Sequence, residues 1–417
     1  MTGRTTPGQP GWGHLSLDDW RSHGDPGEPE AVQKGECMSN RREFLTQAAV
    51  AAAATTVGTR ALAAGNGHHP AGQAPGSGNP ALPGKPPLAM DLFPPQHHYG
   101  AGGTQLGNMF RVTPDDQAEA MLEAAWKSGT RYFDTSPWYG LGLSERRLGH
   151  FLDDKPLEEY VLSTKVGRLL MPDASVDELG IWKGNLNFNY RYDYTAAGVR
   201  RSLEDSLQRL GVSKIDLVYI HDLAPSNKDL GDDWKQYLDT ALKGAMPELT
   251  RMREEGIIGG WGMGVNDIEP SLAAIEHADP DVILQATRYT LLNHQDALSR
   301  LFPQSRRAEV PLVIGAPLGS GFLAGSNHWM YSTDIPQGYR QQRDRISRIA
   351  HEHGTDLRTA ALQFTAAPDV VAATIPGART AEQAKANHQS MQADIPAEFW
   401  QTLKSEGLIA ESAPTPG

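Results

Sequence analysis

The feature that most constrains the fold of this chain is a regular alternation between about residues 100 and 410. Short apolar runs there alternate with longer segments whose apolar residues recur at helical spacing. Eight such strand–helix units favour an α/β fold, a single-domain (β/α)8 barrel of the TIM type, over two smaller domains. The expected strands are 103–109, 131–135, 160–165, 215–221, 257–263, 282–286, 312–316 and 371–375.

The helical segments carry their own start and stop signals. Thr195 is suited to cap a helix that runs to Leu210, and Gly211 follows as a typical helix stop. A doubly wound sheet is the main alternative fold, but it needs a helix directly after a glycine-rich phosphate turn, and residues 100–107 offer glycines without that helix. We expect the long, aromatic-rich segment 167–194 to form a large loop at the top face, as a lid or substrate wall.

Composition excludes several classes of function. Lys and Arg total 38 against 50 Asp and Glu, a net charge of −12, which argues against nucleic-acid binding. The single cysteine, Cys37, excludes an internal disulfide and a cysteine-based metal centre. A metal-dependent barrel hydrolase is a further alternative, but His97-His98 lies beside a linker and His351-x-His353 lies within a helical pattern, so we expect no metal. We also expect no stable membrane insertion of the mature chain, and its oligomeric state stays open.

The front of the chain resembles an export signal. Arg41 and Arg42 are followed by an uncharged stretch to Thr59 and by the small residues of Ala61-Leu62-Ala63, a pattern similar to a twin-arginine signal. We therefore expect export by that route, to the periplasm or the cell exterior. The expected organisation is an upstream non-native or disordered segment (1–37), the signal (38–64), a flexible Pro/Gly-rich linker (65–96), the barrel (97–410) and a disordered tail (411–417).

Polar residues follow three consecutive predicted strands, where a barrel places its chemistry. These are Asp134 with the nearby Tyr139, then Lys165, then His221, and we call these four residues the tetrad. A tyrosine hydroxyl has a pKa near 10, and an adjacent ammonium lowers it. A carboxylate holds that ammonium in place, and a histidine orients a substrate oxygen. The set suits proton transfer in a carbonyl/alcohol pair, and such a reaction needs a separate hydride carrier.

The order of these motifs resembles the aldo-keto reductase family over residues 100–390. The resemblance implies a barrel that binds a nicotinamide dinucleotide without a Rossmann fold. It also implies that Tyr139 is the general acid or base, with Lys165 lowering its pKa, Asp134 pairing Lys165 and His221 orienting the substrate. The motifs are Asp134-Thr135-Ser136-Pro137-Trp138-Tyr139-Gly140, Leu143-Ser144-Glu145, Leu148-Gly149, Ser163-Thr164-Lys165, Asp216-Leu217-Val218-Tyr219-Ile220-His221 and Ile375-Pro376-Gly377-Ala378-Arg379.

Two further stretches, 139–149 and 288–292, are similar to the aldose 1-dehydrogenase branch of that family. That branch includes D-threo-aldose, L-fucose and L-galactose dehydrogenases and pyridoxal 4-dehydrogenase. The resemblance implies an NAD(P)-dependent enzyme that oxidises an aldose hemiacetal to a lactone. A reductase of a non-sugar aldehyde or ketone, and a non-catalytic nicotinamide-binding barrel, are the alternatives, and the presence of all four tetrad residues argues against the latter.

The resemblance also implies where the cofactor is held. The glycine-rich run 318–325 matches a loop over the pyrophosphate, and Arg379 is placed to pair a 2′-phosphate, which favours NADP over NAD. The seventh strand lacks the aromatic residue that stacks on the nicotinamide in the family. The implied cofactor contacts are Asn266, Gln285, Gly319, Gly321, Gly377, Arg379, Gln383 and Asn387.

Overall fold

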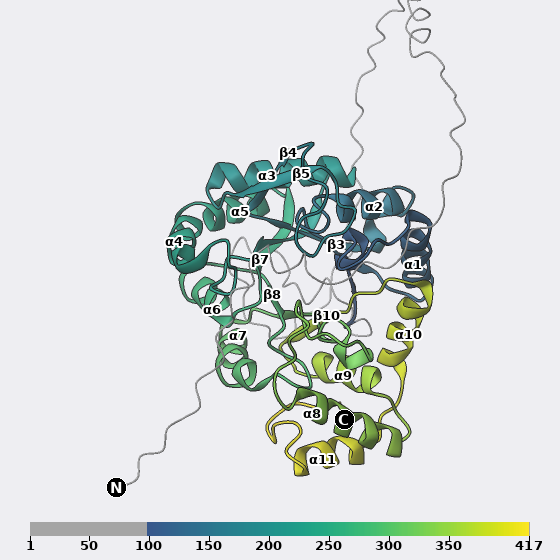
Figure 1. The fold of residues 1–417 in the computed structure, drawn as a ribbon. Helices are drawn as coiled ribbons and strands as arrows, with labels where there is room; N and C mark the ends of the chain where they lie inside the picture. Colours follow the sequence, from purple (N-terminus) through teal and green to yellow (C-terminus); the bar gives the residue numbers. More distant parts are fainter. Residues whose placement is uncertain (1–97, 417) are drawn as a thin grey trace, which may run out of the picture. The chain divides into compact units, whose positions relative to one another are not determined.

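The computed structural model describes residues 98–416, so the predicted signal and linker lie outside the described residues. Eight parallel strands form the barrel, with helices around it (Figure 1). Isolated parallel bridges from Tyr99 to Thr374 and from Gly102 to Gly377 join the last strand to the first, so the predicted (β/α)8 barrel is confirmed. In order around the barrel the strands are β1 (Ala101–Gly102), β2 (Tyr132–Asp134), β3 (Val161–Val166), β6 (Ile215–His221), β7 (Ile258–Val265), β8 (Ile283–Ala286), β9 (Leu312–Gly315) and β10 (Val371–Ile375).

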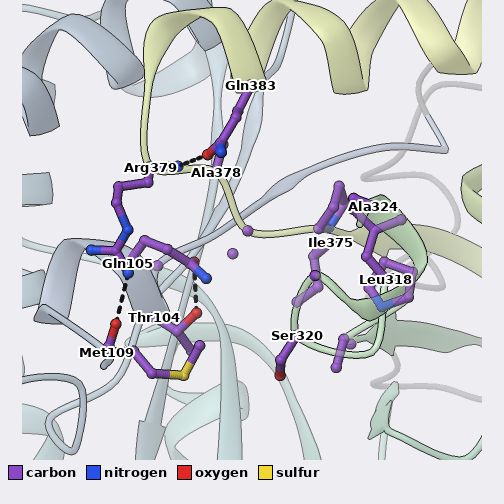
Figure 2. A pocket seen from close by; sticks show the side chains of 18 of the residues that line it. Thr104, Gln105, Met109, Leu318, Ser320, Ala324, Ile375, Ala378, Arg379 and Gln383 are labelled. Atoms are coloured by element: carbon purple, nitrogen blue, oxygen red, sulfur yellow. Dashed lines mark hydrogen bonds between the residues drawn. The ribbon is translucent and has the colours of Figure 1, made fainter. Parts of the chain in front are cut away.

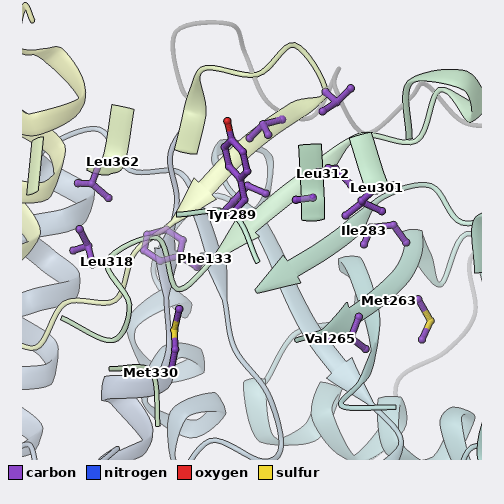
Figure 3. Packing of buried hydrophobic residues seen from close by; sticks show 14 of the residues in the cluster. Phe133, Met263, Val265, Ile283, Tyr289, Leu301, Leu312, Leu318, Met330 and Leu362 are labelled. Atoms are coloured by element: carbon purple, nitrogen blue, oxygen red, sulfur yellow. The ribbon is translucent and has the colours of Figure 1, made fainter. Parts of the chain in front are cut away.

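Two apolar layers hold this arrangement because side chains on a strand alternate between its faces. On β6, Leu217 and Tyr219 belong to the cluster inside the barrel, whereas Val218 and Ile220 pack outward with the helices. Figure 3 shows part of the outer layer, including Phe133. The helices are α1 (Asp115–Lys127), α2 (Leu143–Leu152), α3 (Ala196–Leu210), α4 (Trp234–Lys243), α5 (Ala245–Glu254), α6 (Ile268–His277), α7 (Phe302–Ala308), α8 (Tyr339–Glu352), α9 (Leu357–Ala366), α10 (Ala381–Gln392) and α11 (Ala397–Ser405).

Local signals in the sequence account for the ends of α3. The Thr195 side chain accepts a hydrogen bond of 3.0 Å from the backbone N–H of Gly198, and Gly211 ends the helix with φ at 70°. Both features confirm the predicted cap and stop. None of the described helices is both long enough and apolar enough to cross a membrane.

The predicted first strand, 103–109, is wrong. Only Ala101–Gly102 pairs with β2, and residues 104–107 form a short 3₁₀ helix. The physical reason is the glycine content of this stretch, which lets the chain turn after Gly102 instead of continuing as an extended strand. The segment then lies directly against Tyr139, where Gly107 touches its backbone.

Two other segments differ from expectation. The long segment after Gly167 forms an antiparallel hairpin of β4 (Arg168–Pro172) and β5 (Phe188–Tyr192) where a loop is predicted. The predicted disordered tail is ordered as far as residue 416, because Ala413 is 1% exposed and packs in the apolar cluster outside the barrel. The tail is therefore a part of the fold.

Candidate active site

The strand ends bring the tetrad together. Asp134 ends β2, Lys165 lies near the end of β3 and His221 ends β6. Lys165 Nζ lies 2.6 Å from Asp134 Oδ2 and donates a second hydrogen bond of 2.8 Å to the carbonyl of Thr135. The other Asp134 oxygen accepts a hydrogen bond of 2.7 Å from Ser163. Both charged side chains are 2% exposed, so each ion depends on the other for its solvation.

Tyr139 lies in the turn between β2 and α2. The Lys165 ammonium lies over its ring, 4.5 Å from the ring centroid. The His221 ring stands edge-on to it with centroids 5.8 Å apart, and Trp182 from the loop between β4 and β5 packs at 5.7 Å. A phenol, an ammonium and an imidazole thus surround one point at the top of the barrel, which is the arrangement needed to move a proton at a substrate oxygen.

The electrostatics around Tyr139 are dominated by burial. Burial raises the pKa of Tyr139 well above 10, and the carboxylates of Asp134 and Asp222 act in the same direction, while Arg168 opposes them. The net shift of this pKa is therefore upward, because the loss of water outweighs the opposing effect of the Arg168 guanidinium. The expected lowering by Lys165 stays a prediction. Burial lowers the pKa of His221 well below 6.5, and Arg168 and Lys165 add to that effect. At neutral pH both rings are uncharged.

A groove of about 510 Å³ runs from Asp134 and Tyr139 across the barrel mouth, within the size range of small-molecule sites. Its walls come from the segments after β1, β9 and β10, as Figure 2 shows for Gln105, Ser320 and Gln383. Of the expected cofactor residues, Gly321, Gly377, Arg379, Gln383 and Asn387 line this groove.

The sequence profile of the Aldo/keto reductase family matches residues 99–406. The chain belongs to the aldo/keto reductase family. It is therefore an NAD(P)-dependent oxidoreductase that acts on sugar or other carbonyl substrates. It is 37% identical to a D-threo-aldose 1-dehydrogenase of a Pseudomonas species over 327 residues, 76% of this chain and 94% of that protein. It is also 37% identical to a pyridoxal 4-dehydrogenase of Microbacterium luteolum, over 75% of this chain and 94% of that protein.

Solved structures of the family share the fold at low sequence identity. The holo form of a Bacillus halodurans aldo-keto reductase superposes with a TM-score of 0.59 at 22% identity, covering 76% of this chain and 93% of that one. A Klebsiella pneumoniae aldo-keto reductase in complex with NADPH gives a TM-score of 0.55 at 20% identity, covering 77% and 94%. These likenesses establish the barrel architecture.

The glycines of this aldo/keto reductase have clear steric roles near the groove. A Cβ on Gly319 would lie 2.5 Å from the Trp329 ring, and the residue has φ at 56°. A Cβ on Gly377 would lie 2.1 Å from the side-chain oxygen of Gln105. Gly321, at φ 100°, lines the groove. Gly319 itself does not line it, so its contribution is to shape the loop that does.

Arg379 is held by its own chain. Its guanidinium donates to the carbonyls of Arg111 and Met109, at 3.0 and 2.7 Å, and to the hydroxyl of Thr113 (Figure 2 shows the Met109 bond). Its backbone N–H donates to Gln383 Oε1 at 2.8 Å. Within the described residues Arg379 forms no ion pair with a carboxylate, and burial together with Arg111 lowers its pKa to about 10.

Besides Gly319, two more expected cofactor residues do not line the groove. Gln285 is fully buried on the outer face of β8, where it accepts from Ser271 and donates to the carbonyl of Val265. Its hydrogen bonds are used within the protein, and alternation along β8 places its side chain in the packing behind the strand. A contact between Gln285 and the cofactor stays a prediction. Asn266 lies outside the groove lining as well, and its carbonyl accepts a bond from Arg288.

Four site residues were missed by the sequence interpretation. Arg168 and Asp222 form a 2.9 Å ion pair beside His221. Tyr331, 45% exposed, lines the groove near Tyr139, and Arg111 lines it near Arg379. Their positions in the sequence could have indicated a role, because Arg168 follows Lys165 by three residues and Asp222 follows His221 directly. From the sequence alone, however, each is expected to be an ordinary solvated charge, because its burial depends on the hairpin.

Proposed function

We propose that this protein is an NADP-dependent dehydrogenase that oxidises the cyclic hemiacetal of an aldose to a lactone. The observation that carries the proposal is the position of the Tyr139 ring, which lies beside the Lys165 ammonium and the His221 imidazole and lines a groove of about 510 Å³. Support for the substrate comes from the D-threo-aldose 1-dehydrogenase relative, because this chain spans 94% of that protein at 37% identity.

Unsatisfied polar atoms in the groove fit the phosphates of a dinucleotide. Ser326 Oγ, His328 Nε2 and Arg358 Nε are buried without a hydrogen-bond partner among residues 98–416, and all three residues line the groove. Buried polar groups are seldom left unpaired in a native protein. Hydrogen-bond donors concentrated on one wall therefore favour an anionic ligand there.

The preference for NADP rests on two guanidinium groups. Arg379 is buried without a carboxylate partner, and the exposed side chain of Arg111 comes close enough to disfavour its charge. Two neighbouring cations at one end of the groove are stabilised by a dianion such as a 2′-phosphate. NAD lacks that group and would leave the repulsion in place.

The chain's own residues supply the acid–base chemistry. When bound, the nicotinamide exchanges a hydride with the substrate carbon. In oxidation, Tyr139 accepts the hydroxyl proton of the hemiacetal while His221 holds the same oxygen. In reduction, Tyr139 returns a proton to the oxygen, and its raised pKa keeps it in the protonated form that this direction needs.

The test is a binding and turnover screen of the mature protein. Quenching of tryptophan fluorescence measures NADP and NAD affinity, since Trp138 and Trp182 flank the tetrad. Turnover is then measured with D-threo-aldoses, other aldoses, pyridoxal and simple aldehydes. We expect NADP-dependent lactone formation from an aldose, and turnover restricted to non-sugar aldehydes would reject the aldose assignment.

A second candidate substrate class is an aromatic aldehyde or ketone. Trp138 and Tyr190 stand edge-on with centroids 4.8 Å apart, and Tyr190 and Tyr192 are 5.6 Å apart, so the hairpin presents an aromatic wall beside His221. Such a wall stacks on a flat ring as well as on a sugar face. The pyridoxal 4-dehydrogenase relative supports this candidate, and the same screen separates the two.

We also propose that the protein is exported in folded form by the twin-arginine route, to the periplasm or beyond. The sequence pattern around Arg41 and Arg42 supports this, and that route carries folded cargo with its cofactor bound. Replacing both arginines with lysine should trap the precursor in the cytoplasm. Export that continues unchanged in the double variant would contradict the proposal.

A further inference from the structure

A buried arginine beside the tetrad has no place in the chemistry described so far. Arg168 begins β4, and its side chain is 4% exposed. Its guanidinium lies between the rings of Trp138 and Tyr192, 4.7 Å from each centroid. It donates a 2.7 Å hydrogen bond to the Tyr192 hydroxyl and pairs with Asp222 Oδ2 at 2.9 Å. These contacts fix the guanidinium in one position.

That position places a guanidinium nitrogen against His221. Arg168 Nη1 lies 3.3 Å from His221 Nδ1, and Ser136 Oγ lies 3.0 Å from the same nitrogen. Arginine has no acceptor, so Nη1 can only donate. Ser136 Oγ accepts the backbone N–H of Trp138 at 3.1 Å, and its hydroxyl can either donate to Nδ1 or accept from it. Arg168 is therefore the neighbour that always presents a hydrogen to Nδ1.

Nδ1 must therefore be the unprotonated nitrogen of the ring. A neutral imidazole then carries its hydrogen on Nε2. The groups facing the ring are the cations Arg168 and Lys165, the phenol of Tyr139, and Asp222, whose Oδ1 lies 3.5 Å from Nε2. Burial and the two cations hold the pKa of His221 well below 6.5, so the ring stays neutral despite that carboxylate.

We propose that Arg168, neutralised by Asp222, is a positioning residue that fixes His221 as the Nε2–H tautomer, ready to donate to the reacting substrate oxygen. The inference rests on the proposed function for the identity of that oxygen. The tautomer itself is a property of the protein without substrate. A direct measurement can therefore test it even if the proposed substrate is wrong.

The first experiment observes the ring nitrogens. Long-range ¹H–¹⁵N spectra of protein with ¹⁵N-labelled histidine separate protonated from unprotonated nitrogens, and the His221→Asn variant assigns the signals. We expect a protonated Nε2 and an unprotonated Nδ1 for His221 from pH 6 to 8. A protonated Nδ1, or a doubly protonated ring in that range, would overturn the proposal.

The second experiment removes the guanidinium. In Arg168→Met the Asp222 carboxylate is left without its partner, which favours the imidazolium, so the pKa of His221 should rise toward or above neutrality. We expect kcat/KM to fall by about tenfold to a hundredfold at neutral pH, the range seen when a residue that orients another is lost, and to recover partly at higher pH. Dinucleotide affinity should change by no more than a few-fold.

Companion variants separate charge from orientation. Arg168→Lys keeps a cationic donor and should retain the Nε2–H tautomer with a smaller loss. Arg168→Met combined with Asp222→Asn removes both charges, so His221 should again be neutral yet populate both tautomers. If that double variant shows Nε2–H alone, Arg168 does not set the tautomer and the proposal fails.

Arg253→Met is the matched control. Arg253 on α5 is also 4% exposed and pairs with Asp281 at 2.7 Å, but Asp281 precedes β8, at the end of the barrel opposite to His221. Its loss should lower the melting temperature without moving the pH profile or the His221 signals. If Arg253→Met shifts the pH profile as Arg168→Met does, the effect is a general result of losing a buried charge, and the positioning role is rejected. If Arg168→Met does not fold, the test is the tautomer of His221 in Arg168→Lys. Nε2–H supports the proposal, and a protonated Nδ1 rejects it.

Discussion

A Cβ on Gly107 would lie 2.4 Å from the carbonyl carbon of Tyr139, so only a glycine lets the segment after β1 pack against the turn that carries the proposed acid–base residue. The contact is reciprocal, since a Cβ on Gly140 would lie 2.6 Å from the Gly107 carbonyl oxygen. The glycine-rich stretch that was expected to be a strand therefore packs directly against the backbone of Tyr139. A larger side chain at Gly107 should displace that backbone and, with it, the Tyr139 side chain.

We predict that Gly107→Ala lowers kcat/KM as well as stability. Overpacking a tight contact costs about 1–3 kcal/mol, and here the strain falls on the Tyr139 backbone. The control is Gly149→Ala on α2, whose Cβ would meet the Leu210 carbonyl at 2.3 Å, away from the groove. Both variants should melt earlier, but only Gly107→Ala should lose turnover in the folded protein. Equal turnover in the two variants would contradict this role.

The regular parts of the fold could be predicted because their physics is local. The run 215–221 is apolar on both faces, as a strand buried between a barrel interior and its helices must be, and it forms β6 within those bounds. The tetrad could be located by one rule of topology, that parallel strands bring their carboxyl ends together. The first strand could not, because glycine permits a turn as readily as an extended chain.

Other site features depend on contacts distant in sequence. Arg168 and Asp222 are buried only after the hairpin folds across the barrel mouth, and no periodic pattern marks that event. Gln285 has the residue type of a cofactor contact, but the face on which it lies depends on the register of β8. A shift of one residue moves a side chain from the groove to the packing behind the strand. Such features require the assembled structure.

We predict that Arg111→Ala weakens NADP binding by about tenfold and leaves NAD affinity nearly unchanged. Hydrogen bonds and ion pairs to charged groups contribute about 1.5–3 kcal/mol, and Arg111 has its side chain exposed at the groove. Isothermal titration with each dinucleotide measures both affinities. Arg345→Ala, which removes an exposed guanidinium that pairs with Glu406 outside the groove, serves as control. Equal losses for NADP and NAD would show that Arg111 does not contact a 2′-phosphate.

The pH dependence follows from the directions of two pKa shifts. His221 has a lowered pKa, so it remains neutral as pH falls through 6.5, and reduction should persist below that pH. Tyr139 has a raised pKa, so the phenolate needed as base becomes more available as pH rises, and oxidation should accelerate on the alkaline side. Initial rates in both directions between pH 5 and 10 test this, and an acidic optimum for oxidation would count against it.

We predict that Lys165→Met reduces turnover by roughly 10²–10⁴-fold, the usual contribution of acid–base catalysis. The Tyr139 phenolate then loses the cation over its ring. The pH optimum of oxidation should move upward, and a variant with lower turnover but an unmoved optimum would show that Lys165 acts only in folding.

The remaining prediction concerns the hydroxyl of Tyr139. Tyr139→Phe removes one oxygen and keeps the ring against Lys165 and Trp182, so folding and dinucleotide affinity should stay within a few-fold of the parent. Turnover should fall by about 10²–10⁴-fold, or about 2.7–5.5 kcal/mol of activation free energy, because the variant lacks the hydroxyl that exchanges a proton with the substrate oxygen. Tyr331→Phe removes a phenol from the same groove and serves as the matched control, with a small effect expected. Parental turnover in Tyr139→Phe on a confirmed substrate would mean that the tetrad is not the catalytic centre.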